Sequence, residues 1–216
     1  MAGVRKFDEE AVLDRAMQVF WERGYEAASI DDLTAATGLK RGSLYNAFGD
    51  KERLFLLAID RYRERFERPL LEALADPDPR RGLARMLETE IAGLSGKAVP
   101  AGCLMVNTLA EVGHRSDAVS CVMRRSLATI EGALYDALRR GQATGRLHPG
   151  HDARALARFF VAVSHSIALL QRSLGDERYL HDIARSALLV LDAPPPGGCT
   201  GPSCSCPACK SSGVAV

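Results

Sequence analysis

The sequence predicts an all-α protein, and three observations carry this prediction. Apolar residues recur at the 3.6-residue spacing of amphipathic helices along most of the chain. Glycine and proline fall between these segments rather than inside them. No run shows the apolar-polar alternation of a half-buried strand. With 216 residues, the chain is long enough for one large domain or two small ones.

The first two expected helices carry clear end signals. A first helix is expected over residues 8–23, with Gly24 placed as its C-terminal glycine. Ser29 is a good N-cap for a second, shorter helix that ends near Gly38. Asp32, three residues after Ser29, completes a variant of the capping box.

A third and a fourth helix are expected to follow directly. The third covers residues 40–46, and the fourth covers residues 51–68 with Asp50 as its N-cap. Pro69 is the expected end of the fourth helix, because proline lacks an N–H and clashes with the preceding turn. The turn-rich residues 76–79 then separate this unit from the rest of the chain.

The remaining helical patterns form a second, larger unit. They cover residues 80–94, 101–112, 117–143, 152–174 and 176–191. From Ala193 the composition changes to Pro, Gly, Cys and Ser, which cannot bury a core. We therefore expect an N-terminal helical domain at residues 6–66, a C-terminal helical domain at 67–192 and a flexible tail at 193–216.

Two short helices joined by a glycine-containing turn and stacked on a longer helix are typical of a helix-turn-helix. In that motif the second short helix enters the major groove. Lys40 and Arg41 could meet phosphates or a guanine edge, and Ser43 could donate to a phosphate. Taken alone, these cations could equally be a solvated helix end. Three apolar residues of the same stretch are expected in the core: Leu39, Leu44 and Phe48.

Three segments together resemble the DNA-binding domain of the TetR/AcrR family of bacterial transcriptional regulators. They read FWERGY at 20–25, SIDDL at 29–33 and TGLKRGSLYNAFGDKERLF at 37–55. The match covers about residues 6 to 66. It departs from the family at Asn46, where many relatives carry histidine, and at Arg41, where small or variable residues are frequent.

The resemblance implies an all-helical homodimer whose N-terminal domains insert into successive major grooves of a palindromic operator. It also implies an effector pocket among the C-terminal helices. The positions that it assigns to DNA contact are Ser29, Lys40, Arg41, Gly42, Ser43, Tyr45, Asn46 and Lys51, with Arg5 and Lys6 as a flexible arm.

The C-terminal unit offers weaker clues to the effector. Residues 102–108, GCLMVNT, resemble the middle of the effector domain in one branch of that family. Cys103 and Cys121 are either inert buried thiols or sensors of thiol-reactive compounds. The last two helices are apolar with small residues between, as in helices that pair across a two-fold axis.

The tail concentrates four cysteines within eleven residues: Cys199, Cys204, Cys206 and Cys209. Thiolates so close together could bind a soft metal ion or a metalloid such as trivalent arsenic. The spacing is not that of a standard zinc finger, which has two separated ligand pairs. An idle tail and disulfide or redox chemistry remain open alternatives.

Composition excludes several other classes. A formal net charge of +1 gives no overall basic surface, so any contact with nucleic acid must come from local clusters. No apolar run reaches the roughly 20 residues that span a bilayer, and the N-terminus lacks a signal peptide, so the cytoplasm is the expected location. No phosphate loop, nucleophile elbow or zinc-protease motif points to an enzyme.

The sequence therefore predicts a ligand-responsive transcriptional repressor that acts as a dimer. Its effector is expected to be a small molecule, a thiol-reactive compound or a soft metal. The alternative is a soft-metal or redox-handling protein that acts through the cysteine tail and does not bind DNA.

Overall fold

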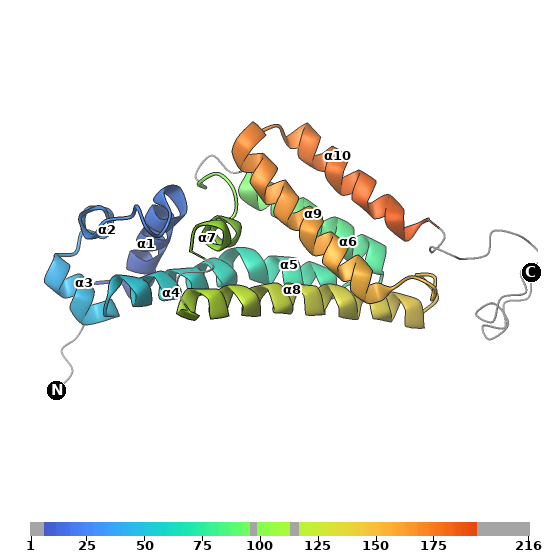
Figure 1. Ribbon diagram of the computed structural model, residues 1–216, viewed down its shortest axis with the longest axis horizontal. Coiled ribbons are helices and arrows are strands. Elements are labelled where there is room, and N and C mark those ends of the chain that lie inside the picture. The colour runs from blue at the N-terminus through green and yellow to red at the C-terminus, as the bar shows by residue number, and fades with distance from the viewer. Residues whose placement is uncertain (1–6, 96–98, 113–116, 194–216) are drawn as a thin grey trace, which may run out of the picture.

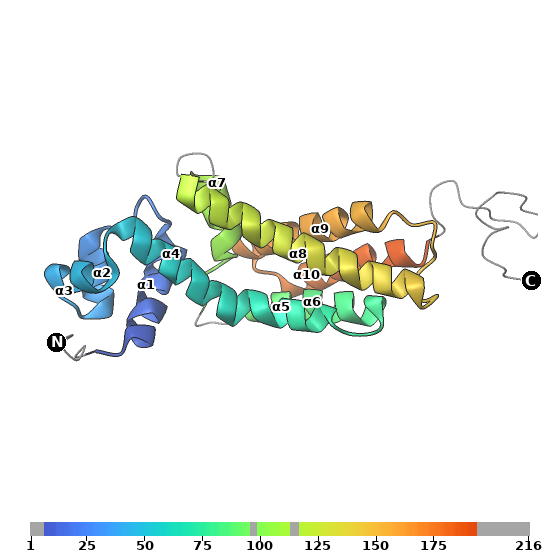
Figure 2. The same ribbon diagram turned by 90° about the horizontal axis from the view of Figure 1, so that it is seen from below.

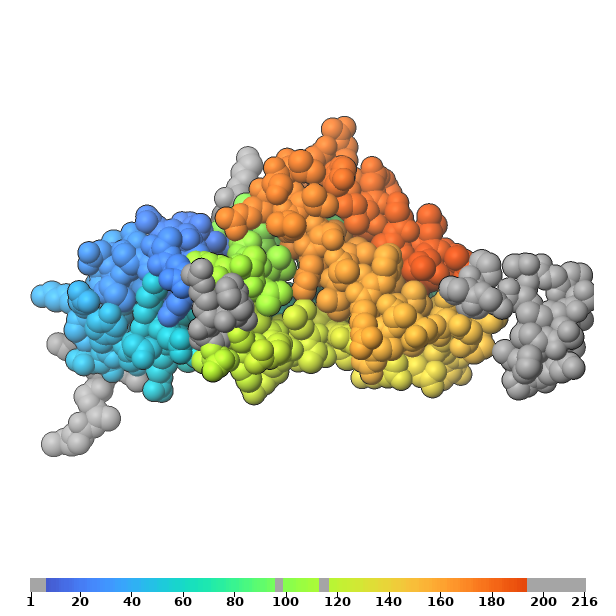
Figure 3. Space-filling view, viewed as in Figure 1, coloured from blue at the N-terminus to red at the C-terminus, as the bar shows by residue number. Residues whose placement is uncertain are grey.

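The computed structural model describes residues 7–95, 99–112 and 117–193. Within these ranges the chain forms helices joined by turns and contains no strand, so the all-α prediction is confirmed. The molecule is elongated: a small N-terminal module occupies one end and a layered helical bundle extends from it (Figure 1). In the space-filling view the two parts are in contact (Figure 3).

The N-terminal module consists of four helices, and a side chain caps the start of each of them except the third. They are α1 (Glu9–Arg23), α2 (Ile30–Thr37), α3 (Arg41–Phe48) and α4 (Lys51–Tyr62). Ser29 and Asp32 form a complete capping box at the start of α2. The Asp50 carboxylate accepts a hydrogen bond from the Arg53 N–H at 2.8 Å, which starts α4 as predicted.

Fully buried aromatic and aliphatic side chains hold these helices together. Phe20 of α1 packs edge-on against Phe55 of α4, with ring centroids 4.9 Å apart. Leu44 and Phe48 anchor α3 on this core, and each contributes roughly 1.5–3 kcal/mol by leaving water. These four residues, with Leu33, keep α3 in a fixed orientation on the module.

The predicted end of the fourth helix at Pro69 is wrong. The chain continues from α4 through a π-helical turn (Arg63–Glu67) into α5 (Arg68–Leu74). The N–H of Arg68 bonds to the carbonyl of Arg63, five residues back, which widens the turn. Pro69 lies in the first turn of α5, where its missing N–H leaves no intrahelical bond unmade. One helical run therefore passes from the N-terminal module into the bundle (Figure 2).

The bundle contains five more helices, all close to their predicted positions. They are α6 (Pro79–Leu94), α7 (Leu104–Val112), α8 (Asp117–Ala143), α9 (Ala153–Leu174) and α10 (Glu177–Leu188), followed by a 3₁₀ turn (Leu189–Leu191). Helix α7 begins three residues later than expected. A second core joins α5, α6, α8, α9 and α10 around side chains such as Leu83, Leu87, Leu134 and Phe160.

The module is tied to the bundle at its inner end. The indole N–H of Trp21 donates to the carbonyl of Gly102 at 2.8 Å, and this bond is buried. The N–H of Gly102 in turn donates to the side-chain oxygen of Gln171 on α9, also at 2.8 Å. Trp21 packs edge-on against Tyr62 and Phe66, with ring centroids 4.9 and 5.0 Å away. Movement of the bundle around Gly102 therefore reaches α1 directly.

Among the described residues, α9 alone is long and apolar enough to cross a membrane by length and composition. Its inner face lies in the second core through residues such as Phe160 and Ile167. Core helices pass the same test, so this helix is weak evidence for a membrane span.

Candidate nucleic-acid interface and effector cavity

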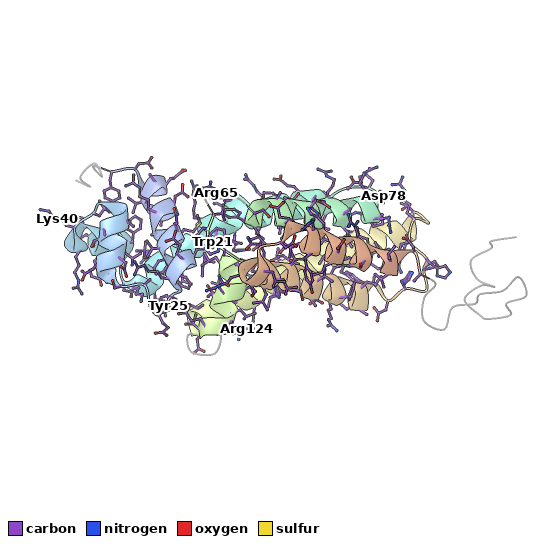
Figure 4. The ribbon with its side chains drawn as sticks, turned by 90° about the horizontal axis from the view of Figure 1, so that it is seen from above. Trp21, Tyr25, Lys40, Arg65, Asp78 and Arg124 are labelled. Atoms are coloured by element: carbon purple, nitrogen blue, oxygen red, sulfur yellow. The ribbon has the colours of Figure 1, made fainter. Side chains whose placement is uncertain are left out.

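Helix α3 presents a polar outer face at the far end of the module. Lys40, Arg41, Ser43 and Asn46 are exposed and Tyr45 is half-buried, while Leu44 and Phe48 point inward. The Arg41 guanidinium lies 5.7 Å from the centroid of the Tyr45 ring. Lys40 lies at the end of the molecule opposite to Asp78 (Figure 4). The whole outer face of α3 can thus reach a groove without obstruction by the bundle.

Gly42 occupies the first turn of α3 on this exposed face. A Cβ atom built there would meet nothing within 4 Å. The protein itself therefore does not require glycine at this position. A surface that must come close to another molecule would require it, because each added side-chain atom holds the two backbones apart.

Ser29 and Lys51 are more engaged in the protein than the other predicted contacts. The Ser29 hydroxyl accepts from the Asp32 N–H at 3.1 Å and donates to the Asp32 carboxylate at 2.7 Å. The Lys51 ammonium donates to the Glu26 carbonyl at 3.3 Å and lies 4.8 Å from the centroid of the Tyr25 ring. Both residues border the turn between α1 and α2, on the same end of the module.

A cavity of about 250 Å³ lies in the bundle next to the module. Its lining comes from α4, the π-helical turn, α5, α6, α7, α8 and α9, together with Cys103 just before α7. Most of the wall is apolar, including Phe66, Leu94, Met123 and Ile130. A small molecule with an apolar body matches such a wall.

Two acidic residues lie in the cavity wall and differ in their pairing. Glu67 forms an ion pair with Arg63 at 3.1 Å and accepts a hydrogen bond from Ser126. Glu90 accepts one hydrogen bond, from Ser164 at 2.8 Å, and its other carboxylate oxygen has no partner among the described residues. Burial raises the pKa of Glu90 to about 8.

The two described cysteines lie in different surroundings. Cys103 lines the cavity, and the Tyr62 hydroxyl donates to its Sγ at 3.1 Å. Burial raises the pKa of the Cys103 thiol, so the thiol is protonated at neutral pH. Cys121 is exposed on α8 and is not part of the cavity wall. His165 also lines the cavity, and burial lowers its pKa.

The cysteines predicted to bind a metal ion lie outside the part of the chain that the structure describes. No group of three or more metal-binding side chains occurs among residues 7–95, 99–112 and 117–193. Cys199, Cys204, Cys206 and Cys209 lie outside the described residues, as do Arg5 and Lys6.

Helix α7 connects the cavity with the turn that precedes α2. Its residues Met105, Val106 and Leu109 line the cavity. Its Glu111 carboxylate accepts hydrogen bonds from the backbone N–H groups of Tyr25 at 2.9 Å and Glu26 at 2.7 Å. Gly24 makes this approach possible, since a Cβ atom there would lie 2.6 Å from Glu111 Oε2 and the residue has a φ of +85°.

Helices α9 and α10 carry an exposed face with apolar side chains. Along α9, Phe159, Ala162, Ser166, Leu169 and Ser173 follow one exposed stripe. Leu169 is 56% exposed and Tyr179 of α10 is 48% exposed. A shallow groove between the two helices is lined by Phe159, Tyr179 and Ile183 among others.

Comparison with known proteins decides the family. Residues 12–58 match the model of bacterial regulatory proteins of the tetR family, and residues 79–188 match the tetracyclin repressor-like C-terminal domain. The chain belongs to the TetR family of bacterial transcriptional regulators. It is a DNA-binding transcriptional regulator of this family.

Individual relatives align over most of this TetR-family regulator. The transcriptional repressor ComR of Escherichia coli is 33% identical over 194 residues, which cover 84% of this chain and 88% of ComR. The uncharacterised regulator YezE of Bacillus subtilis is 30% identical and is covered completely. A cysteine mutant of the regulator CifR, solved with a 26-bp operator, is 33% identical, with a TM-score of 0.81 over 86% of this chain and 98% of that one.

Sequence reasoning missed three residues of this TetR-family regulator that the structure makes prominent. Glu90 and Glu111 are acids on amphipathic helices, where a carboxylate ordinarily faces water. Tyr62 is one of the buried residues of α4, where an aromatic side chain ordinarily fills the core. No local signal distinguishes these residues, because their roles depend on contacts with segments distant in the chain, such as Glu90 with Ser164.

Proposed function

We propose that this regulator binds a palindromic operator as a homodimer and releases it when a small molecule occupies the cavity between α4 and α9. Residues 6–66 bind DNA, residues 67–192 bind the effector and form the dimer, and the cytoplasm is the site of action. The observation that carries the proposal is the combination of an unobstructed α3 face with a cavity that shares α4 with the DNA-binding module.

The exposed face of α3 supports the predicted contacts with DNA. Lys40, Arg41 and Asn46 are exposed, and Lys40 lies at one end of the molecule (Figure 4), so two copies could reach successive major grooves about one helical turn apart. Gly42 and Ser43 fit close contact with the phosphate backbone, and Tyr45 is held beside Arg41. Ser29 and Lys51 would contact phosphates at the edge, although both already bond within the protein.

The face formed by α9 and α10 supports dimerisation through these two helices. Large apolar side chains such as Leu169 and Tyr179 are about half exposed there, and small residues lie between them on α9. Two such helix pairs related by a two-fold axis would bury this face in a four-helix bundle.

The cavity supports a small-molecule effector more directly than a thiol-reactive one. Its wall is mostly apolar, and the Cys103 thiol is kept protonated by burial, which lowers its nucleophilicity. The effector would need to bind the released geometry more tightly than the DNA-bound one, by about 3 kcal/mol for a hundredfold change in operator affinity. Three parts of the wall contact the start of the DNA-binding module: Tyr62 and Phe66 pack against Trp21 of α1, and Glu111 of α7 bonds to the turn before α2.

A gel-shift series with the DNA upstream of the protein's own gene tests this proposal. The wild type is expected to give a specific shift that weakens steeply with salt, because phosphate contacts release counterions. The Arg41→Ala, Tyr45→Ala double variant is expected to lose the specific shift while keeping its thermal stability. Absence of a specific shift by the wild type on any native promoter would refute the operator role.

The cysteine tail gives a separate test of metal sensing. In the same assay, zinc, cadmium or arsenite would release the wild type if the tail is a sensor. A variant with Ser at positions 199, 204, 206 and 209 would then no longer respond. Identical behaviour of the two proteins toward every metal would leave the tail without a regulatory role.

A further inference from the structure

Glu90 is a buried acid without a countercharge. It lies on α6 in the cavity wall, and its side chain is 91% removed from solvent. Ser164 donates to one carboxylate oxygen, and the other oxygen is buried and has no hydrogen-bond partner among the described residues. Burying a carboxyl oxygen in an apolar wall without a hydrogen bond costs free energy. A ligand that donates a hydrogen bond to this oxygen would remove that cost.

The basic side chains in or next to the described cavity wall do not form an ion pair with Glu90. Arg65 is exposed, and its guanidinium lies over the Phe66 ring at 5.6 Å from the centroid. Arg63, next to the cavity, is bonded to Glu67 through two nitrogens. Burial lowers the pKa of His165, so its imidazole is neutral at neutral pH. Within the described wall, Glu67 is therefore compensated and Glu90 is not.

From this difference we infer that the cavity takes a small, mostly apolar molecule that carries one basic amine, and that Glu90 recognises the ammonium group. This inference rests on the proposed role of the cavity as the effector site. The ammonium donates to the Glu90 carboxylate, while the apolar body fills the space between Phe66, Met123 and Ile130. Ser164 holds the carboxyl in place through its hydrogen bond of 2.8 Å.

The shape of the wall supports an amine with a compact body. The volume of about 250 Å³ admits a single ring or a short branched chain. A charge-assisted hydrogen bond in a desolvated site is about twice as strong as a neutral one. A difference of about 1.4 kcal/mol in binding free energy is a tenfold difference in affinity. We therefore expect a ligand with the ammonium group to bind about tenfold more tightly than one of the same shape with a neutral head group.

Calorimetric titration of the full-length protein with benzylamine and with benzyl alcohol tests this inference. The two probes have similar shape and differ in charge. The wild type is expected to bind benzylamine about tenfold more tightly, and Glu90→Gln to bind the two probes equally. Glu90→Asp keeps the charge and is expected to retain part of the preference. Glu72→Gln, which removes an exposed carboxylate on α5, is expected to leave the preference unchanged.

Several outcomes would overturn the inference. They are failure of the wild type to bind benzylamine, equal binding of both probes by the wild type, and a preference that survives in Glu90→Gln. Two controls are run on the same preparations. Circular dichroism shows whether each variant is folded, and the operator gel shift tests the proposed function independently of ligand binding. A protein that binds its operator but not benzylamine would refute the ligand class and leave the repressor role intact.

Discussion

Glu111 and Tyr25 are 86 residues apart in the chain, and the carboxylate of Glu111 accepts the backbone N–H of Tyr25 at 2.9 Å. A second bond, from the N–H of Glu26, makes the contact bidentate. The turn before α2 thus takes its position from α7, a helix of the bundle whose other residues line the cavity.

Replacing Glu111 with alanine is expected to uncouple the cavity from the DNA-binding module. Two backbone N–H groups lose their acceptor, which costs on the order of 1–3 kcal/mol of stability. The variant is expected to bind the operator, but the ratio of operator affinities without and with effector falls several-fold. Denaturant unfolding and gel shifts measure the two effects. Glu22→Ala, which removes an exposed carboxylate on α1, is the matched control, and an unchanged ratio in Glu111→Ala would contradict the coupling.

Gly42→Ala is expected to separate folding from DNA binding. Alanine in this helical position has open space for its Cβ and stabilises the fold by up to about 1 kcal/mol. Operator affinity is expected to fall about tenfold or more, because the methyl group holds the backbone away from DNA. Thermal melts and gel shifts measure both. Gly132→Ala on α8 has equal space for its methyl group, and it is expected to stabilise without altering affinity.

Leu169→Glu is expected to turn the dimer into a monomer. The charge would lie in the centre of the proposed α9–α10 interface, where its desolvation costs several kcal/mol. Light scattering coupled to size exclusion measures the mass, and the operator shift is expected to weaken with it. Ala128→Glu, on the exposed side of α8, is expected to leave the mass unchanged. If the Leu169→Glu variant is still a dimer, the interface is not formed by this face of α9 and α10.

Iodoacetamide at neutral pH is expected to modify Cys121 faster than Cys103. Cys121 is exposed, whereas Cys103 lines an interior cavity and its raised pKa keeps it as a thiol. Peptide mass spectrometry over a time course gives both rates. In guanidinium chloride the two rates are expected to converge. Faster modification of Cys103 in the folded protein would show a more reactive cavity thiol.

Glu90 is expected to make stability fall as pH rises between about 4.5 and 8. The folded protein keeps the Glu90 proton up to a pKa of about 8, whereas the unfolded chain loses it near the ordinary value of 4.5. The unfolded state therefore binds fewer protons in this window, and the contribution is lost at up to about 1.4 kcal/mol per pH unit. Urea unfolding of Glu90→Gln and wild type across this window isolates the effect. The difference in stability is expected to grow in favour of the variant, and a constant difference would contradict the shifted pKa.

Most helices of this protein could be predicted from the sequence because their ends carry local signals. Asp50 caps α4 and the Ser29–Asp32 pair caps α2, and these contacts involve residues no more than three positions apart. The continuation past Pro69 could not be predicted, because no local signal marks the wider turn of residues 63–67 that carries the helix up to the proline. The exposed face of α3 followed from its periodicity. The surroundings of the Glu90 carboxyl did not, since its hydrogen-bond partner Ser164 comes from another helix, α9.

The cavity wall has two parts that are expected to evolve differently: residues on the continuous helix from α4 to α5, and residues on α8. Changes at Tyr62 or Phe66 alter the fit of the ligand and also disturb Trp21. New ligand preferences acquired there are therefore expected to change operator affinity as well. Ile130 on α8 lines the cavity and packs against the second core, so changes there can retune ligand preference alone. Among related repressors that answer different compounds but keep similar promoters, variation is expected to concentrate on the α8 and α9 wall.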